Sequence, residues 1–233
     1  MVVAIRTDVR KVAEAADTIS LEQALTAVGS LPREEFVSAE GRSLAYLDLP
    51  QNIGFGQTIS DPYIVAVMTG ALQLPPGADV LDVGTGSGYQ AAVLAKVARQ
   101  VSSIEIVPEL AASAAIRLKR LGFANVEVRS GDGFAGWPEH APFDGIVVAA
   151  GAAEVPRPLI DQLKPGGRLV MPIGPTAGSE QLLVVTKQPD GSLSQCSLGP
   201  AMFVPLTGRG AAPRAQFGQV YPAIQLCHGA PVT

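Results

Sequence analysis

The chain has 233 residues, of which 47% are hydrophobic and 16% charged, and its formal net charge is −4. This length allows one full-sized hydrophobic core with a small appendage. The acidic balance leaves no broad basic surface for a phosphate backbone, so nucleic acid is not expected as a partner. The few cysteines and histidines lack metal-ligand spacing, and we expect no metal site.

The N-terminus carries charges throughout and lacks the apolar run of a signal peptide. No stretch of about 18 apolar residues is present to span a bilayer. We therefore expect a cytoplasmic protein with no membrane partner. In that reducing compartment, Cys196 and Cys227 are expected to be unpaired thiols.

Residues 1–60 predict a helical cap followed by an ordered loop. Apolar residues recur at helical spacing in two runs, which are Val9, Val12 and Ala16, and then Leu21, Leu25 and Val28. From position 31 to 60 the periodicity is lost and prolines and glycines gather. Loops of this length in a compact domain are often functional.

Residues 61–207 predict an α/β core. Asp61 or Ser60 can cap a helix that begins near Pro62, because proline suits the first helical turn. Five short β-branched runs follow, separated by helical stretches, at 79–83, 101–105, 126–129, 145–149 and 168–172. Strands that alternate with helices imply a doubly wound, mostly parallel, Rossmann-like sheet with helices on both faces.

A later pair of runs, at 181–187 and 192–205, flanks the turn sequence QPDG and predicts a hairpin at the sheet edge. The sheet then has about seven strands, and the order of the last two stays open. Residues 208–233 are rich in Gly, Ala and Pro with little periodicity, and form a tail of uncertain order.

The densest chemical motif is VLDVGTGSGYQ, residues 80–90, in which a buried strand runs into a glycine-rich turn that opens a helix. Glycines permit positive φ and close backbone approach, and a helix N-terminus offers unpaired N–H groups to an anion. A dinucleotide fingerprint would need glycine where Tyr89 stands, which disfavours hydride transfer. Asp82 instead precedes the turn, where it can attract the ammonium end of an amino-acid-like ligand such as S-adenosylmethionine.

Two further acids end the next two strands. Glu105 lies about 20 residues past the turn, where a carboxylate can accept hydrogen bonds from both ribose hydroxyls. Asp132 can accept from an adenine amino group. A single carboxylate at a strand end is as often a loop cap, but three acids in order beside the turn favour one nucleoside ligand at the carboxyl edge of the sheet.

With these motifs the sequence resembles the protein-L-isoaspartate O-methyltransferase family, whose fold is that of class I S-adenosylmethionine-dependent methyltransferases. The resemblance runs from about Leu21 to Thr207. It is carried by LPREEFV, IGFGQTIS, PYIVAVMT, DVGTGSGYQ, SGDG, APFDGIVV, LIDQLKPGGRLVMPIG and FVPLTG. Many methyltransferases share the glycine turn, whereas GQTIS and FVPLTG are specific to this family.

The resemblance implies S-adenosylmethionine as cofactor, S-adenosylhomocysteine as product, and no metal. The residues implied to bind the cofactor are Asp82, Gly84, Thr85, Gly86, Ser87, Gly88, Glu105, Asp132, Gly133 and Thr207. The residues implied to line the substrate site are Gln57, Thr58, Ile59 and Ser60, and Ser60 matches the active-site serine. Residues 1–60 would thus hold the cap and substrate loop, 61–207 the cofactor-binding core and 208–233 the tail.

The implied reaction is methyl esterification of L-isoaspartyl residues in damaged proteins and peptides, which starts their repair. A carboxylate nucleophile with a pKa near 4 is already ionised, so no general base is needed. The partners would be such proteins, and we expect a monomer. Asp61 departs from the family, which more often has Gln or Ala there, and brings a negative charge close to an anionic substrate.

Two other functions fit the same motifs. A dedicated methyltransferase could tailor an aspartyl or isoaspartyl residue of one partner peptide, which Asp61 and the unplaced tail would favour. A non-catalytic protein could retain S-adenosylmethionine as a structural or sensing ligand, but the complete GQTIS segment would then lack a purpose.

Overall fold

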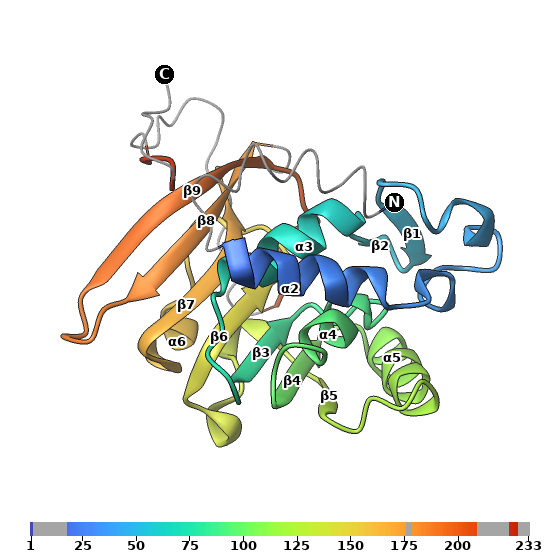
Figure 1. Cartoon of the computed structure of the whole chain (residues 1–233), viewed down its shortest axis with the longest axis horizontal. Helices are drawn as coiled ribbons and strands as arrows, with labels where there is room; N and C mark the ends of the chain where they lie inside the picture. Colours follow the sequence, from blue (N-terminus) through green and yellow to red (C-terminus); the bar gives the residue numbers. More distant parts are fainter. Residues whose placement is uncertain (2–17, 176–178, 209–223, 228–233) are drawn as a thin grey trace.

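The computed structural model describes residues 1, 18–175, 179–208 and 224–227. Its centre is a seven-stranded sheet in the order β5-β4-β3-β6-β7-β8-β9 (Figure 1). The strands are β3 (Asp79–Val83), β4 (Gln100–Glu105), β5 (Val126–Ser130), β6 (Phe143–Val148), β7 (Leu163–Ile173), β8 (Glu180–Lys187) and β9 (Leu193–Ala201). Strands β3 to β7 run parallel, and β8 and β9 are antiparallel to their neighbours. The expected doubly wound, mostly parallel sheet is confirmed.

The strand order reverses beside β3, since β4 and β5 lie on one side of it and β6 and β7 on the other. In open α/β sheets such a switch point leaves a crevice outside the carboxyl ends of the strands, where ligands bind. The last two strands, whose order the sequence left open, follow one another outward, with β9 at the edge. The predicted hairpin is confirmed.

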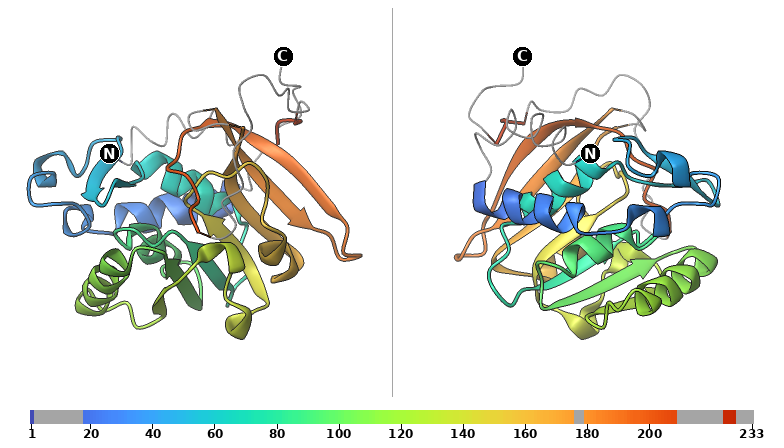
Figure 2. Two further views of the ribbon diagram at one scale, coloured as in Figure 1. Left: turned by 180° about the vertical axis from the view of Figure 1, so that it is seen from behind. Right: turned by 45° about the vertical axis from the view of Figure 1, so that its right-hand side comes forward.

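Helices cover both faces of the sheet. One face carries α2 (Thr18–Gly29), α3 (Pro62–Ala71), α4 (Tyr89–Leu94) and α5 (Pro108–Arg120), and the other carries the short α6 (Arg157–Asp161). The strand side chains alternate between the two cores, so that Val80 faces the helices and Leu81 faces the opposite layer. Figure 2 shows α2 lying beside α3 from two further sides.

The second predicted N-terminal helix is confirmed as α2, which buries Leu21, Leu25 and Val28. The first predicted helix, at Val9, Val12 and Ala16, lies outside the described residues. Helix α3 begins at Pro62 as expected, and Asp61 is its N-cap, with its carboxylate accepting a hydrogen bond from the Ile64 N–H at 2.7 Å.

The loop expected before α3 contains more regular structure than predicted. Two 3-10 turns, η1 (Arg33–Glu35) and η2 (Arg42–Leu44), are followed by the antiparallel strands β1 (Gln51–Gly54) and β2 (Gln57–Ile59). The connecting residues Gly54, Phe55 and Gly56 all have positive φ, at 90°, 55° and 70°. Strands of four and three residues are too short to show alternation, which is why the sequence indicated only a loop.

The expectation of two unpaired cysteines is wrong, because Cys196 and Cys227 form a disulfide. Residues 225–227 lie along the outer edge of β9: the Ser197 N–H donates to the Gln225 carbonyl, and the Cys227 N–H donates to the Ser197 carbonyl, both at 2.9 Å. This pairing brings the two cysteine Cα atoms to 4.9 Å, a normal disulfide separation. The C-terminal segment is thus tied covalently to the edge strand.

No helix in the described ranges has both the length and the apolar character needed to cross a membrane.

Reduction of the disulfide should lower stability. The bond joins residues 31 positions apart, and a cross-link of that span restricts the unfolded chain. We expect its loss to decrease the free energy of unfolding by about 2–4 kcal/mol, measured by urea denaturation with and without dithiothreitol. A Cys196→Ser/Cys227→Ser double variant should show the lower value in both conditions. Equal midpoints for the oxidised and reduced wild type would contradict the pairing.

Candidate active site

A cavity of about 410 Å³ lies at the switch point of the sheet. The residues at the ends of β3 and β4, and those just after β6, line the cavity. The cavity therefore lies at the carboxyl edge of the sheet. Three further segments complete its walls: residues 57–65, the glycine turn 84–87 with the start of α4, and residues 200–207. Cavities of this size hold small ligands.

The glycine turn after β3 has a backbone that only glycine adopts easily. Gly84 and Gly86 line the cavity with φ of +95° and +51°, in the left-handed region that disfavours a Cβ atom. A Cβ on Gly86 would also come within 3.3 Å of the Ile53 side chain in β1. The backbone itself therefore forms this wall, and it is held in place because the Gly84 and Thr85 N–H groups donate to the Ile104 carbonyl at 2.8 and 3.2 Å.

Glu105, the last residue of β4, fixes this turn. Its carboxylate accepts hydrogen bonds from the Gly86 N–H at 2.7 Å and from the Val107 N–H at 3.0 Å. Each carboxylate oxygen can accept more than one hydrogen bond. Glu105 also lines the cavity, so it can both hold the turn and receive a ligand hydroxyl.

Asp82 does not line the cavity but lies behind its wall, fully buried. One carboxylate oxygen accepts a hydrogen bond from the Ser103 hydroxyl at 2.7 Å, and that hydroxyl lies 2.5 Å from the hydroxyl of Thr85, which does line the cavity. The other oxygen has no hydrogen-bond partner among the described residues. Burial raises the pKa of Asp82 to about 7, an effect that the Ser103 bond opposes and the Glu105 charge reinforces.

Asp132 is partly exposed and does not line the cavity, and it caps the 3-10 turn η3 (Gly133–Ala135) by accepting a hydrogen bond from the Phe134 N–H at 3.0 Å. A Cβ on Gly208 would meet the Asp132 carboxylate at about 2.5 Å, so the chain after Thr207 passes directly over this acid. Gly133 lines the cavity, and a Cβ there would approach Val83 to 2.4 Å. A side chain at either glycine would push these segments apart.

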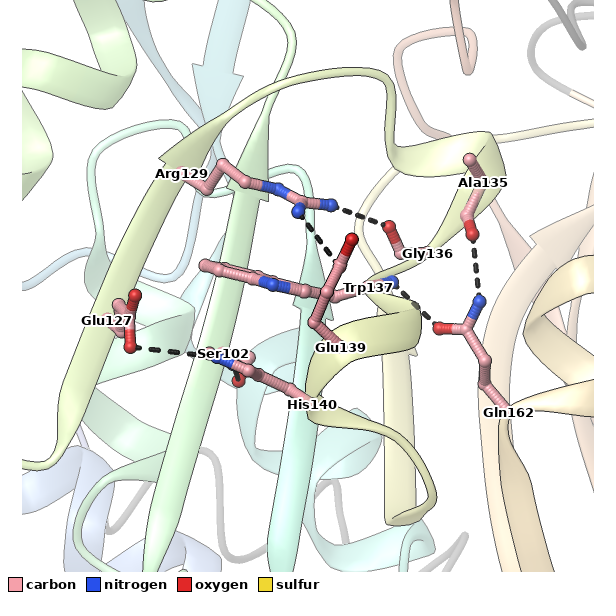
Figure 3. Close-up of polar contacts among 9 residues, drawn as sticks. All are labelled: Ser102, Glu127, Arg129, Ala135, Gly136, Trp137, Glu139, His140 and Gln162. Atoms are coloured by element: carbon pink, nitrogen blue, oxygen red, sulfur yellow. Dashed lines mark hydrogen bonds and ion pairs between the residues drawn. The ribbon is translucent and has the colours of Figure 1, made fainter.

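Side-chain hydrogen bonds attach the segment after η3 to the rest of the fold (Figure 3). The Gln162 amide accepts a hydrogen bond from the Trp137 N–H at 2.7 Å and donates one to the Ala135 carbonyl at 2.8 Å. Arg129 donates to the Gly136 carbonyl at 3.0 Å and lies 4.1 Å above the Trp137 ring. These contacts hold the position of Gly133 at the cavity.

Gln57, Thr58, Ile59 and Ser60 all line the cavity on the side opposite the sheet. The buried Arg33 guanidinium, stacked over the Tyr89 ring, donates a hydrogen bond to the Ser60 carbonyl at 2.8 Å and thereby fixes its peptide group. Because Asp61 caps α3, the Ser60 side chain is not the cap. Its hydroxyl makes no hydrogen bond with any described residue, which leaves it available to a ligand.

Residues 200–207 all line the cavity, but of these the sequence predicted only Thr207 as a site residue. This segment is held to the loop after β6 by two backbone hydrogen bonds of 2.8 Å, from the Gly151 N–H to the Val204 carbonyl and from the Leu206 N–H to the Gly151 carbonyl. The FVPLTG motif was the available signal, but no periodicity shows which of its residues face a ligand.

The cavity therefore brings together all the expected site residues except Asp82, Gly88 and Asp132, which do not line it. Among the described residues, the only charged ones that line it are the acids Asp61 and Glu105, and no described Lys, Arg or His does so. Within the described ranges, no group of His, Cys, Asp and Glu is arranged to hold a metal. The site favours a ligand that carries positive charge.

Comparisons with known proteins agree on one family. Residues 9–211 match the family model described as protein-L-isoaspartate(D-aspartate) O-methyltransferase. The chain is 52% identical over 209 residues to protein-L-isoaspartate O-methyltransferase 2 of Syntrophobacter fumaroxidans, which covers 89% of this chain and 85% of that protein.

Two solved structures are similar in fold. One is a protein-L-isoaspartate O-methyltransferase, with a TM-score of 0.76 and 29% identity over 92% of this chain and 67% of that one. The other is a Plasmodium falciparum protein described as a protein-L-isoaspartate O-methyltransferase and crystallised with S-adenosyl-L-homocysteine. Its TM-score is 0.69 at 25% identity, over 88% of this chain and 97% of that one.

The buried Asp82 should make stability depend on pH. An unfolded aspartate ionises near pH 4, whereas Asp82 in the folded protein keeps its proton to about pH 7. Between these values the folded state binds more protons, so the free energy of unfolding falls as pH rises. Urea denaturation from pH 4 to about 7 should show a flatter profile for Asp82→Asn than for wild type, by a few kcal/mol over the range. Parallel profiles would contradict this assignment.

Proposed function

The chain belongs to the protein-L-isoaspartate(D-aspartate) O-methyltransferase family, and we propose that it uses S-adenosylmethionine to methyl-esterify L-isoaspartyl residues in damaged proteins and peptides. The ester would start the repair of those residues. The observation that carries the proposal is the single cavity that the glycine turn and the Ser60 segment share.

The residues at the cavity fit this cofactor. The glycine turn is a cradle that side chains at Gly84 and Gly86 would distort, and the acidic wall suits a ligand with ammonium and sulfonium charges. When bound, S-adenosylmethionine supplies an electrophilic methyl group on positively charged sulfur. S-adenosylhomocysteine is the product that must then leave.

We assign the wall residues to direct cofactor contact, namely Gly84, Thr85, Gly86, Ser87, Glu105, Gly133 and Thr207. Glu105 receives the ribose hydroxyls while it holds the turn. Asp82, Gly88 and Asp132 support these residues, Asp82 through the Ser103 and Thr85 hydroxyls, Gly88 as the N-cap of α4 and Asp132 as the N-cap of η3, which begins at Gly133.

The substrate carboxylate needs orientation more than activation. It is already ionised at neutral pH, so it needs no general base. The Ser60 hydroxyl donates a hydrogen bond to one carboxylate oxygen and directs the other toward the methyl group. Arg33 holds the Ser60 peptide in place for this task. Such positioning, with water excluded, can supply several kcal/mol of the barrier.

The peptide around the isoaspartyl residue would bind along β2. Within the part of the chain that the structure describes, this strand pairs only with β1 in a two-stranded sheet, which leaves an edge for an added strand. Gln57 and Thr58 lie on this strand between the hairpin tip and Ser60. Main-chain hydrogen bonds would accept many sequences, as repair of damaged proteins requires.

We also propose that the enzyme is a monomer and acts in the cytoplasm, with residues 1–60 as cap and substrate loop, 61–207 as the core and 208–233 as the tail. The Cys196–Cys227 disulfide is unusual for a cytoplasmic protein, because cytoplasmic reductants keep most thiols reduced.

A dedicated methyltransferase for one partner peptide is the second candidate, and the position of Asp61 in the cavity wall favours it. The two functions differ in substrate range. Repair requires activity on unrelated isoaspartyl peptides, whereas tailoring requires one sequence.

The test is methyl transfer from labelled S-adenosylmethionine to two peptides that differ only in isoaspartate or aspartate at one position. We expect base-labile label on the isoaspartyl peptide alone. Ser60→Ala should lower kcat/KM at least tenfold, as expected for a lost hydrogen bond to a charged group, with unchanged affinity for S-adenosylhomocysteine by calorimetry. Wild-type kcat/KM in this variant would remove Ser60 from the mechanism, and label on neither peptide would count against the repair function.

A further inference from the structure

Asp61 has an unusual position for a helix cap, because it lies at the N-terminus of α3 and also in the wall of the active-site cavity, directly after Ser60. The hydrogen bond from the Ile64 N–H uses only one of its two carboxylate oxygens. The second oxygen can therefore act toward a ligand while the first one caps the helix.

The surroundings of Asp61 make the charge at this wall negative. Asp48 accepts a hydrogen bond from the Tyr63 N–H at 2.9 Å in the same first turn of α3, and it is exposed. In the described part of the chain, the cation that acts on Asp61 is Arg33, which is fully buried and donates to the Ser60 carbonyl. Burial, and secondarily the Asp48 charge, raise the pKa of Asp61, while the Ile64 bond and Arg33 oppose the rise.

An isoaspartyl carboxylate that reaches Ser60 must approach this acidic wall, and among the described residues no basic side chain lines the cavity to offset it. A cationic side chain next to the isoaspartyl residue can offset it, because unlike charges attract in a partly desolvated site. An acidic neighbour adds repulsion, which is a common way for a site to reject a ligand.

On the premise of the proposed function, we propose that Asp61 is a specificity-determining residue that favours isoaspartyl peptides with a Lys or Arg directly beside the damaged residue and disfavours those with Asp or Glu there. Asp48 adds to the same field from the outer side. The enzyme then repairs basic segments of damaged proteins faster than acidic ones.

The test compares isoaspartyl peptides that are identical except for Lys, Gln or Glu in the two positions that flank the isoaspartate. In wild type, kcat/KM should decrease in the order Lys, Gln, Glu, with at least a tenfold ratio between the first and the last. Asp61→Asn should reduce that ratio to about threefold or less. Asparagine is as good an N-cap as aspartate, so this variant removes the charge but keeps the cap.

Two variants serve as controls. Asp48→Asn should reduce the ratio by a smaller factor. Asp190→Asn removes an acid from the turn between β8 and β9, outside the cavity wall, and should leave the ratio unchanged. Thermal unfolding and the affinity for S-adenosylhomocysteine, measured by calorimetry, show whether each variant keeps its fold and its cofactor site.

Salt gives a second measurement that needs no variant. The wild-type ratio should fall when ionic strength rises from 0.01 to about 1 M, since screening weakens charge interactions at a partly exposed site. An equal rate on all three peptides, or a ratio that neither Asp61→Asn nor salt changes, would overturn the role of Asp61 and leave the proposed function intact. A protein that methylates none of the peptides would instead contradict the proposed function.

Discussion

The backbone of the turn after β3 is the constraint on which the site depends. A buried strand ends at Val83, and the chain must turn within a few residues into α4, with Gly84, Gly86 and Gly88 all at positive φ. The turn lies at the carboxyl edge of the sheet, where the strand order reverses and where ligands bind in open α/β sheets. Glu105 from β4 braces it from one side, and the buried Asp82, Ser103 and Thr85 chain supports it from below.

Segments far apart in the sequence complete the cavity around this turn. The β1–β2 hairpin and Ser60 come from before the core, and residues 200–207 come from after it. Arg33 fixes the first segment, and pairing with Gly151 fixes the second. The disulfide between Cys196 and Cys227 encloses the second segment in one covalent loop. The proposed cofactor and substrate sites thus lie at one edge of the sheet, but different contacts hold the segments that form them.

Local patterns in the sequence predicted most of the sheet, α3 and the residues of the glycine turn, because β-branched runs, a cap before Pro62 and clustered glycines act over a few residues. Features that depend on distant contacts were not predictable. The β1–β2 strands are too short for a periodic signal, and the disulfide requires residues 225–227 to pair with β9. The burial of Asp82 and its hydrogen bond to Ser103 likewise depend on the packing of β3 against β4, which no local pattern indicates.

The most direct test of this account is the affinity for S-adenosylhomocysteine of Gly86→Ala beside Gly122→Ala, measured by isothermal titration calorimetry. Both glycines have positive φ, at +51° and +83°, so both variants carry backbone strain, but only Gly86 lines the cavity. We predict that Gly86→Ala loses at least tenfold in affinity for S-adenosylhomocysteine and that Gly122→Ala keeps the wild-type affinity. Equal affinities in wild type and both variants would show that the glycine turn does not hold the cofactor.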